Sequence, residues 1–256
     1  MREALTRLLF EERHPDLFAL RHAGSGKSAL AAWGFEHGDG WFAIIAALAE
    51  VVESRSPSAC VVQCKEKFGT LRVYLRNDGN DRYCRGALLT AAGVSGRVSE
   101  LSGRPGRMMT RTQSCPGGPR SVFSGVRTLA PAEAAGWEPA QPGEPDAPAG
   151  ADELRARHLD ILRGATIAVP TPCLGLIDAW LGALRAADAP PQGLRLARLG
   201  LDGDTAPVGQ VGEEVLGATA FHAALGRRVD RRSGSVGPVD DRGRLLACRA
   251  VLDDSR

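Results

Sequence analysis

The stretch WGFEHGDGWFAIIAALAEVVE, Trp33–Glu53, followed by CVVQCKEKFGTLRVYL, Cys60–Leu75, decides the fold. Apolar residues within Trp41–Glu53 recur at the spacing of one helical face, which predicts an amphipathic helix. We expect Asp39 to be its N-cap, because a carboxylate accepts hydrogen bonds from the free amides of a first turn. The second stretch predicts two short strands around a turn at Lys67–Thr70, where a glycine supplies the positive φ.

A composition break divides the chain. The segment EPAQPGEPDAPAGAD, residues 138–152, has no large apolar residue and predicts an exposed linker. It separates an N-terminal domain, residues 1–137, from a C-terminal domain, residues 153–256. The other expected elements are a helix over 81–98, a small irregular glycine-rich hairpin over 99–129, helices over 153–163, 173–187 and 213–230, a strand over 193–199 and a glycine-bearing hairpin over 233–248.

The second half repeats the order of the first, which predicts a diverged tandem copy. Four residues recur 131 positions later in the chain. They are Val98, Ser102, Gly103 and Gly106, which are matched by Val229, Ser233, Gly234 and Gly237. The predicted fold class is therefore α+β, with two tandem α-β-β-α units, each followed by a small glycine-rich knuckle or hairpin.

Composition limits the classes of function. Apolar residues make up 43% of the 256 residues and charged residues 24%, which is typical of a globular protein. The formal net charge of +2 gives no broad field to attract nucleic acid or anionic lipid. The start of the chain lacks the pattern of a signal peptide, and the longest apolar stretch, Trp41–Ala49, is too short to span a bilayer. Six scattered cysteines indicate free thiols and a cytoplasmic protein.

The stretch AGSGKSAL, Ala23–Leu30, ends like a phosphate-binding loop. Such a loop needs its first glycine five residues before the second, and here Arg21 stands in that place before Gly26. No apolar strand precedes the stretch, because RHPDLFALRH is charged and contains a proline. We therefore interpret it as an exposed Gly/Ser loop.

Cysteines and histidines raise two further alternatives, a zinc site and a catalytic thiol. No C-x2-C pair accompanies Cys60 and Cys64, and on a regular strand both would share one half-buried face with Val62. A helix dipole favours only the Cys173 thiolate, but its apolar neighbours indicate a packed helix start. We predict no metal ligand, no cofactor and no catalytic residue.

Three segments together resemble a family of uncharacterised bacterial and phage proteins. They are Trp33–Glu53 with its GDGW box, Val61–Leu75 with its Q-x-K-E-K-F-G-x-L-R hairpin, and SELSGRPGRMMTR, Ser99–Arg111. The resemblance covers residues 1 to about 139. It implies a fold and little about function, because the family has no established activity.

The chain departs from the family pattern at its cysteine knuckle. The resemblance implies a C-x2-C pair followed by a Cys and a His, whereas this chain has Ser99 and Ser102, then Ala130 and Glu133. In the second half the knuckle positions are Asp230 and Ser233. Serine hydroxyls are poor zinc ligands compared with thiolates. The resemblance therefore implies a degenerate zinc ribbon whose metal has been lost.

No cluster of acid, base and nucleophile emerges, so we expect a non-enzymatic protein-interaction or scaffold protein. The candidate partner-binding residues are Asp39, Trp41, Lys65, Glu66, Lys67 and Arg72. One alternative is a nucleic-acid-associated accessory protein that joins the basic hairpin to the arginine-rich segment 227–232 on one face. Another is an enzyme with a site between the halves, built from Asp39, Lys65, Glu66 and Arg72.

Overall fold

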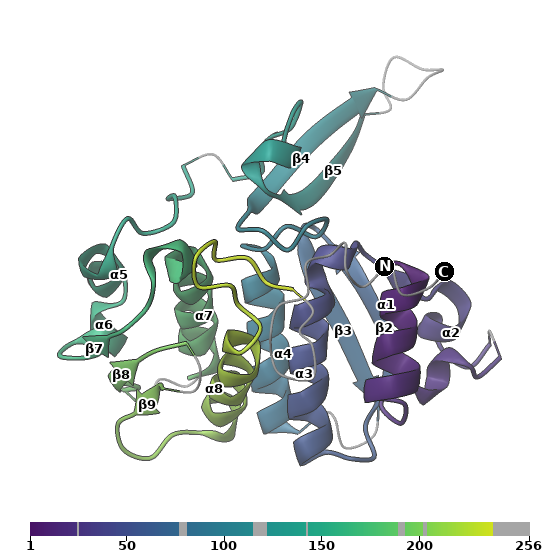
Figure 1. Ribbon diagram of the computed structural model, residues 1–256, viewed down its shortest axis with the longest axis horizontal. Helices are drawn as coiled ribbons and strands as arrows, with labels where there is room; N and C mark the ends of the chain where they lie inside the picture. Colours follow the sequence, from purple (N-terminus) through teal and green to yellow (C-terminus); the bar gives the residue numbers. More distant parts are fainter. Residues whose placement is uncertain are drawn as a thin grey trace.

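The computed structural model describes residues 1–24, 26–76, 81–114, 122–141, 143–188, 193–201 and 204–237. It confirms an α+β fold, in which a central group of helices lies between small sheets (Figure 1). The described strands form three sheets of three strands each. No helix in these ranges combines the length and the apolar character that a bilayer crossing requires.

The first half begins with short helices and continues with a sheet flanked by longer ones. Its elements are α1 (Glu3–Arg7), a π-helical turn (Leu8–Arg13), α2 (Ala29–Trp33), β1 (Phe35–Glu36), α3 (Phe42–Arg55), β2 (Cys60–Lys67), β3 (Thr70–Arg76) and α4 (Arg82–Ser95). Strand β1 pairs in parallel with β2, and β2 pairs antiparallel with β3.

Helix α3 is buried around almost its whole circumference, not along one face as its spacing predicts. Every residue from Phe42 to Ala49 is buried, because the sheet covers one side while α4 and helix α8 (Glu213–Gly226) pack on others. The expected N-cap is also wrong. A 3₁₀ turn, Asp39–Trp41, leads into the helix, and the Asp39 carboxylate instead accepts hydrogen bonds from Arg2 N at 2.7 Å and from Arg2 Nε.

A β-bulge in β2 corrects the expected position of two cysteines. The register slips between Val61 and Gln63, and one extra residue reverses the face on which the following side chains lie. Cys60 is therefore half-buried on one face of the sheet, whereas Cys64 is fully buried on the other.

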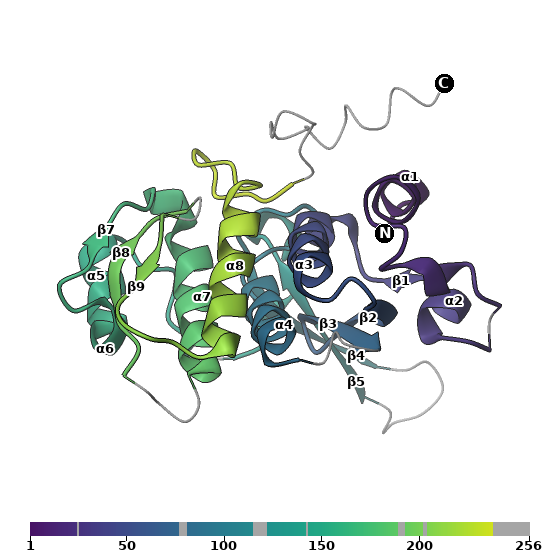
Figure 2. The same ribbon diagram turned by 90° about the horizontal axis from the view of Figure 1, so that it is seen from below.

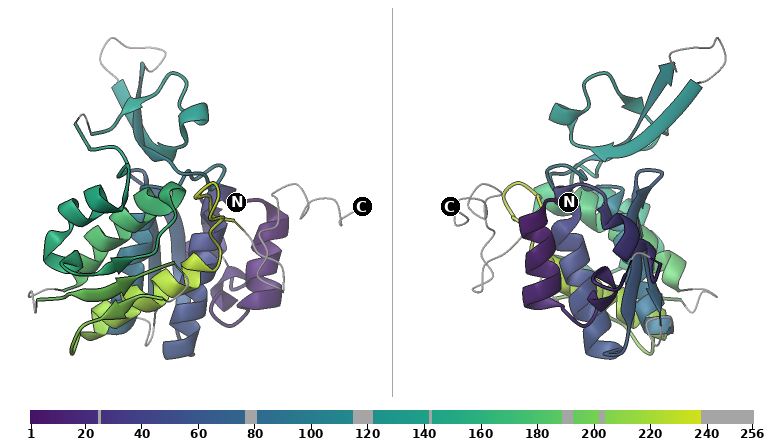
Figure 3. Two further views of the ribbon diagram at one scale, coloured as in Figure 1. Left: turned by 60° about the vertical axis from the view of Figure 1, so that its left-hand side comes forward. Right: turned by 90° about the vertical axis from the view of Figure 1, so that its right-hand side faces the viewer.

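The described residues of 99–129 include two longer and more regular strands than the sequence predicts. Strands β4 (Arg107–Ser114) and β5 (Val122–Leu129) pair residue by residue over their whole length. The short strand β6 (Glu138–Pro139) adds to the other edge of β4. Among the described residues of this stretch, irregular backbone is limited to the glycine-bearing segment before β4. The paired strands project away from the helices (Figure 3).

The second half has elements of the same kinds as the first. They are α5 (Ala151–Arg157), α6 (Leu159–Leu162), β7 (Thr166–Ile167), α7 (Leu174–Ala187), β8 (Leu196–Leu199), β9 (Ala206–Pro207) and α8. The predicted helix over 153–163 is thus divided in two at His158. The predicted strand over 193–199 begins only at Leu196. Most of the expected hairpin over 233–248 lies outside the described residues.

The order of elements in the two halves is the same. Each half has a short strand, a helix, two strands and a helix, with a parallel pair first and an antiparallel pair second. Helices α4 and α8 begin at Arg82 and Glu213, which are 131 positions apart. An isolated bridge follows each helix, Val98 with Pro105 and Val229 with Val236, again at that spacing.

The two halves meet where α4 packs against α8 (Figure 2). A Cβ placed on Gly86 would lie 1.9 Å from the carbonyl oxygen of Glu214, and one on Gly217 would lie 1.8 Å from that of Tyr83. Each residue of one contact lies 131 positions from its counterpart in the other. The contact is self-complementary, like the interface of a two-fold dimer, and one apolar core continues through both halves.

The segment 138–152 runs over the surface, and more than half of its described residues are exposed. Besides β6, ion pairs with residues of the preceding half tie it to its surroundings. Glu144 pairs with Arg97 at 2.9 Å, and Asp146 pairs with Arg107 at 3.3 Å. The division into domains at this segment stays a prediction.

Candidate functional site

The hairpin β2–β3 has one covered face and one open face. Its apolar residues Val61, Val73 and Leu75 lie against α3, beside Ile45 and Leu48. The opposite side, here called the outer face, consists of the residues that alternate with them in the register: Gln63, Lys65, Lys67, Thr70, Arg72 and Tyr74. None of the six is buried. Figure 2 shows α3 and α4 on one side of this sheet.

Cations and aromatic rings lie next to one another on this hairpin. Lys65 Nζ lies 6.0 Å from the centre of the Tyr74 ring, and Lys67 Nζ lies 5.4 Å from that of Phe68. The Phe68 side chain is 71% exposed and Tyr74 is 44% exposed. With Arg72, which is opposite Lys65 in the register, these residues form a positive surface with two accessible rings.

Glu66 does not contribute its charge to the outer face. It is paired in the register with buried Leu71, and its carboxylate accepts a hydrogen bond from Gly69 N at 2.6 Å. Glu66 therefore fixes the turn. The same turn is held from outside, because Thr128 of β5 donates its hydroxyl to the Gly69 carbonyl at 2.5 Å.

The turn itself requires an unusual backbone. Phe68 has a φ of 54° and Gly69 a φ of 77°, which are the positive values of a type I′ hairpin turn. Glycine adopts this region freely, whereas a phenylalanine in it is strained. Phe68 was not among the predicted binding residues, although an aromatic residue directly before a turn glycine can be recognised in the sequence.

Phe68→Asn is expected to raise the free energy of unfolding by about 1 kcal/mol, because asparagine tolerates the left-handed region better than phenylalanine. Urea denaturation of the variant measures this. Tyr74→Asn, a change on the same hairpin at an extended backbone position, serves as the control and should not be stabilising. A less stable Phe68→Asn protein would contradict the assigned turn.

Two of the predicted partner-binding residues lie away from the outer face. Trp41 is fully buried, and its Nε1 donates to the Val98 carbonyl at 2.7 Å. Asp39 is held by Arg2. The structure therefore brings together Lys65, Lys67 and Arg72 but not the complete predicted set. Trp41 supports the fold, since its indole joins the start of α3 to the knuckle.

The positions that the resemblance implies for zinc ligands meet in space. The Ser99 hydroxyl donates to Glu133 Oε2 at 2.5 Å, and Ala130 N donates to the same oxygen at 3.0 Å. Burial alone would raise the pKa of Glu133, but hydrogen bonds from Ser102, Ser99 and Ala130 hold it below its usual value. A Ser–Glu hydrogen bond thus joins the knuckle to the segment after β5.

The second knuckle has a simpler arrangement. Asp230 accepts a hydrogen bond from the Ser233 hydroxyl at 2.7 Å and another from Arg232 N at 2.9 Å. Ser233 is exposed, in contrast to buried Ser99. Within the described ranges, no three His, Cys, Asp or Glu residues are grouped so that they could hold a metal ion.

Ser99→Ala is expected to lower the free energy of unfolding by about 2 kcal/mol, because the buried Ser99 hydroxyl loses its hydrogen bond to the half-buried Glu133 carboxylate. The Ser99 oxygen also accepts from Leu101 N at 3.1 Å and from Ser102 N at 3.3 Å. Ser233→Ala, the same change at the exposed knuckle, should cost less than about 1 kcal/mol. Equal losses of unfolding free energy in the two variants, measured by chemical denaturation, would show that the Ser99–Glu133 hydrogen bond does not contribute more than the exposed one.

One cysteine and one histidine do form a pair, but it is not suited to nucleophilic catalysis. His37 Nδ1 donates to the Gly38 carbonyl at 2.8 Å, so Nε2, 3.5 Å from Cys64 Sγ, is the acceptor for the thiol. Burial lowers the pKa of His37 to about 4 and raises that of the Cys64 thiol. Both groups are therefore neutral near pH 7, and the reactive thiolate is disfavoured.

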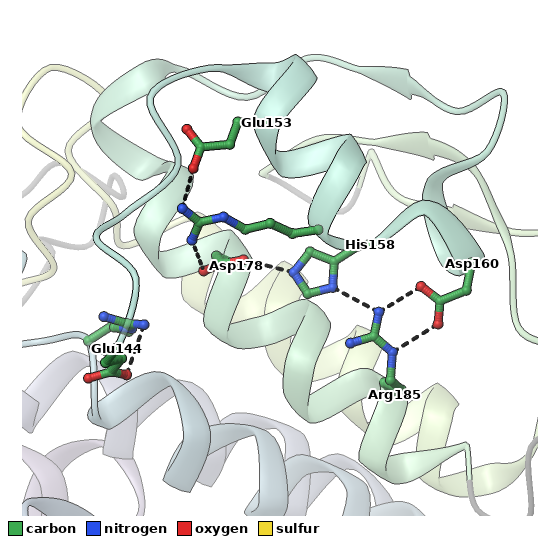
Figure 4. A network of polar contacts seen from close by, with 8 residues as sticks. Glu144, Glu153, His158, Asp160, Asp178 and Arg185 are labelled. Carbon is green, nitrogen blue, oxygen red and sulfur yellow. Dashed lines mark hydrogen bonds and ion pairs between the residues drawn. The ribbon is translucent and has the colours of Figure 1, made fainter. Parts of the chain in front are cut away.

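A second histidine lies in a larger polar network (Figure 4). His158 Nε2 donates to Asp178 at 2.8 Å, and its Nδ1 accepts from Arg185 at 3.2 Å. Arg185 also pairs with Asp160, and Arg157 joins Glu153 to Asp178. Because both ring nitrogens are occupied, His158 lacks the free lone pair of a general base. The network ties α5 and α6 to α7.

The remaining alternatives receive little support from geometry. Ser28 accepts a hydrogen bond from Ala31 N at 3.0 Å and caps α2, which has only five residues. Arg227 and Arg228 pair with Glu50 of α3. Figure 2 shows the end of α8 on the opposite side of the helices from the β2–β3 sheet, so the arginine-rich segment does not extend the outer face.

Comparison of the chain with family models, with curated proteins and with solved structures finds no match. Its function is therefore argued from its own residues.

Proposed function

We propose that this chain is a non-enzymatic binding protein that recognises an acidic protein partner through the outer face of the β2–β3 hairpin. The observation that carries the proposal is the pairing of Lys65 with Tyr74 and of Lys67 with Phe68 on an uncovered sheet face. Aromatic residues and arginine contribute most binding energy at protein interfaces, while surrounding charges steer a complementary partner.

A catalytic site between the halves is less well supported. Asp39 is paired with Arg2, and Glu66 is hydrogen-bonded to the hairpin turn. Lys65 and Arg72 lie on the outer face, away from α8. The four groups do not converge on one position, which acid–base or nucleophilic chemistry requires.

Single-stranded nucleic acid is a second candidate partner, favoured by one observation. Phe68 and Tyr74 are both exposed beside lysines, and bases stack on such rings while cations bind the phosphates. The small number of cations and the distant position of Arg227 and Arg228 place this candidate second.

The test is affinity capture from the native host, with the full chain as bait and mass spectrometry as readout. An acidic protein should be retained by the natural sequence and lost with Lys65→Glu/Lys67→Glu. The matched control, Lys27→Glu/Arg163→Glu, has the same change in charge at exposed positions elsewhere and should retain the partner. Loss of the partner in both variants, or in neither, would contradict the proposal.

Fluorescence anisotropy with labelled oligo(dT) and oligo(U) at low salt separates the second candidate from the first. Binding that weakens with salt and disappears in Phe68→Ala/Tyr74→Ala would favour nucleic acid. No binding at low salt would remove that candidate.

We also propose that the two units arose by tandem duplication of an α-β-β-α ancestor. The common order of elements, the bridges after α4 and α8 and the reciprocal glycine contacts support it. In an experimental structure, residues 35–106 should superpose on 166–237 after a single two-fold rotation. Unrelated paths for these segments would contradict the duplication.

A further inference from the structure

A cavity of about 380 Å³ lies between the base of the β4–β5 hairpin and the start of α7. Figure 1 shows the upper end of α7 directed towards this hairpin. The walls come from both halves and from the segment between them: Arg97, Pro105, Gly106, Arg107, Met109 and Leu129, then Pro131, Ala134, Asp146 and Ala147, then Pro172, Gly175, Leu176 and Gly234.

The walls of the cavity are largely apolar and cannot easily collapse inward. A Cβ on Gly234 would lie 2.0 Å from the Pro172 carbonyl oxygen, and one on Gly106 would lie 2.7 Å from that of Leu129. These contacts show that backbone segments are already in close approach around the space. A preformed apolar cavity of this size is typical of small-molecule sites.

The charges around the cavity favour an anion. Arg97 and Arg107 line it, and Asp146 is the one acidic residue among its lining residues. Asp146 is 89% exposed, so its ion pair with Arg107 is weak and easily exchanged. Arg97 is 16% exposed and is held by Glu144, which Figure 4 shows beside the segment that leads to α5.

Helix α7 adds to the positive potential. Its first turn contributes Gly175 and Leu176 to the wall. The N-terminal end of a helix carries partial positive charge, which favours an anionic group close to it. The guanidinium groups and this helix end therefore act in the same direction.

We infer that this cavity binds a small molecule with a flat apolar body and one anionic group, such as an aromatic carboxylate. The apolar body lies between the Met109–Leu129 side and the Leu176 side, and the anion is bound at Arg97 and Arg107. None of the outer-face residues lines the cavity, so the inference is independent of the proposed partner-binding function.

The test compares two probes of nearly equal shape, 2-naphthoate and 2-naphthamide, by titration calorimetry with the full chain. We expect 2-naphthoate to bind with a Kd of roughly 0.1–1 mM. The neutral amide should bind at least about tenfold more weakly, because charge-assisted hydrogen bonds are lost. Equal affinity of the two probes, or no binding of 2-naphthoate at several millimolar, would overturn the inference.

Two variants assign the binding to this cavity. Ala134→Trp places a large ring in it from the partly exposed rim and should abolish binding. Leu89→Trp, on an exposed surface of α4, is the control and should leave the affinity unchanged. Arg97→Gln should remove the preference for 2-naphthoate without removing the apolar contribution. If Ala134→Trp binds 2-naphthoate unchanged and circular dichroism shows that it is folded, the probe binds elsewhere and the inference is overturned.

Discussion

Gly217→Ala is expected to lower the free energy of unfolding by about 3 kcal/mol, since overpacking of this kind ranks among the costly core substitutions. The added methyl group would overlap the Tyr83 carbonyl oxygen, 1.8 Å from the ideal Cβ position. That oxygen belongs to the backbone of α4, so relief requires two helices to move apart. Gly86→Ala should have a similar effect, because its methyl group would meet the Glu214 carbonyl oxygen.

Gly182→Ala provides the matched control. This glycine lies within α7, and no atom apart from its chain neighbours and the backbone of its own helix lies within 4 Å of its ideal Cβ position. Alanine has the better helix propensity, so the variant should be more stable by about 0.5–1 kcal/mol. Urea denaturation of the three variants measures the difference. A Gly217→Ala protein as stable as the natural one would mean that α4 and α8 are further apart than described.

Acidification from pH 7 to pH 4 is expected to remove about 3 kcal/mol of stability through His37 alone. Burial lowers its pKa in the folded protein to about 4, against an ordinary value of 6.5. Between these two values the unfolded chain binds the proton and the folded chain does not. Stability from this residue is therefore present above pH 6.5 and is lost as the pH falls towards 4.

His37→Gln isolates this effect, because glutamine keeps polar groups in the ring's place but does not titrate. The variant should be less stable at pH 7 and show a shallower loss of stability between pH 6.5 and pH 4. His22→Gln, a change at an exposed histidine earlier in the chain, is the comparison and should keep the natural slope. The same slope in His37→Gln as in the natural chain would show that other groups cause the acid sensitivity.

Local patterns predicted the elements that depend on local chemistry. The hairpin turn at residues 67–70 contains a glycine that needs a positive φ, and the structure places the strands on either side of it. Helices α3, α4, α7 and α8 lie within or close to the stretches 41–53, 81–98, 173–187 and 213–230 that were expected to be helical. The bulge at Val61 and Gln63 was not predicted, since one inserted residue leaves no compositional signal and yet separates Cys60 from Cys64.

Long-range contacts account for the other differences. The spacing of α3 indicated one apolar face, because a pattern along one helix does not reveal how many neighbours will cover it. Asp39 looked like an N-cap, but the distant Arg2 provides stronger donors. The cavity beside α7 was not predicted at all, since its walls come from residues as far apart as Arg97 and Gly234.

The reciprocal glycine contact between α4 and α8 has a consequence for how the molecule opens. Because backbone packs directly against backbone at this contact, the two halves have little room to unfold independently of each other. Amide protons on both helices should therefore exchange with solvent mainly through complete unfolding of the protein, so the slowest protons of the two helices should exchange at the same rate. Amide protons of the projecting hairpin should exchange faster.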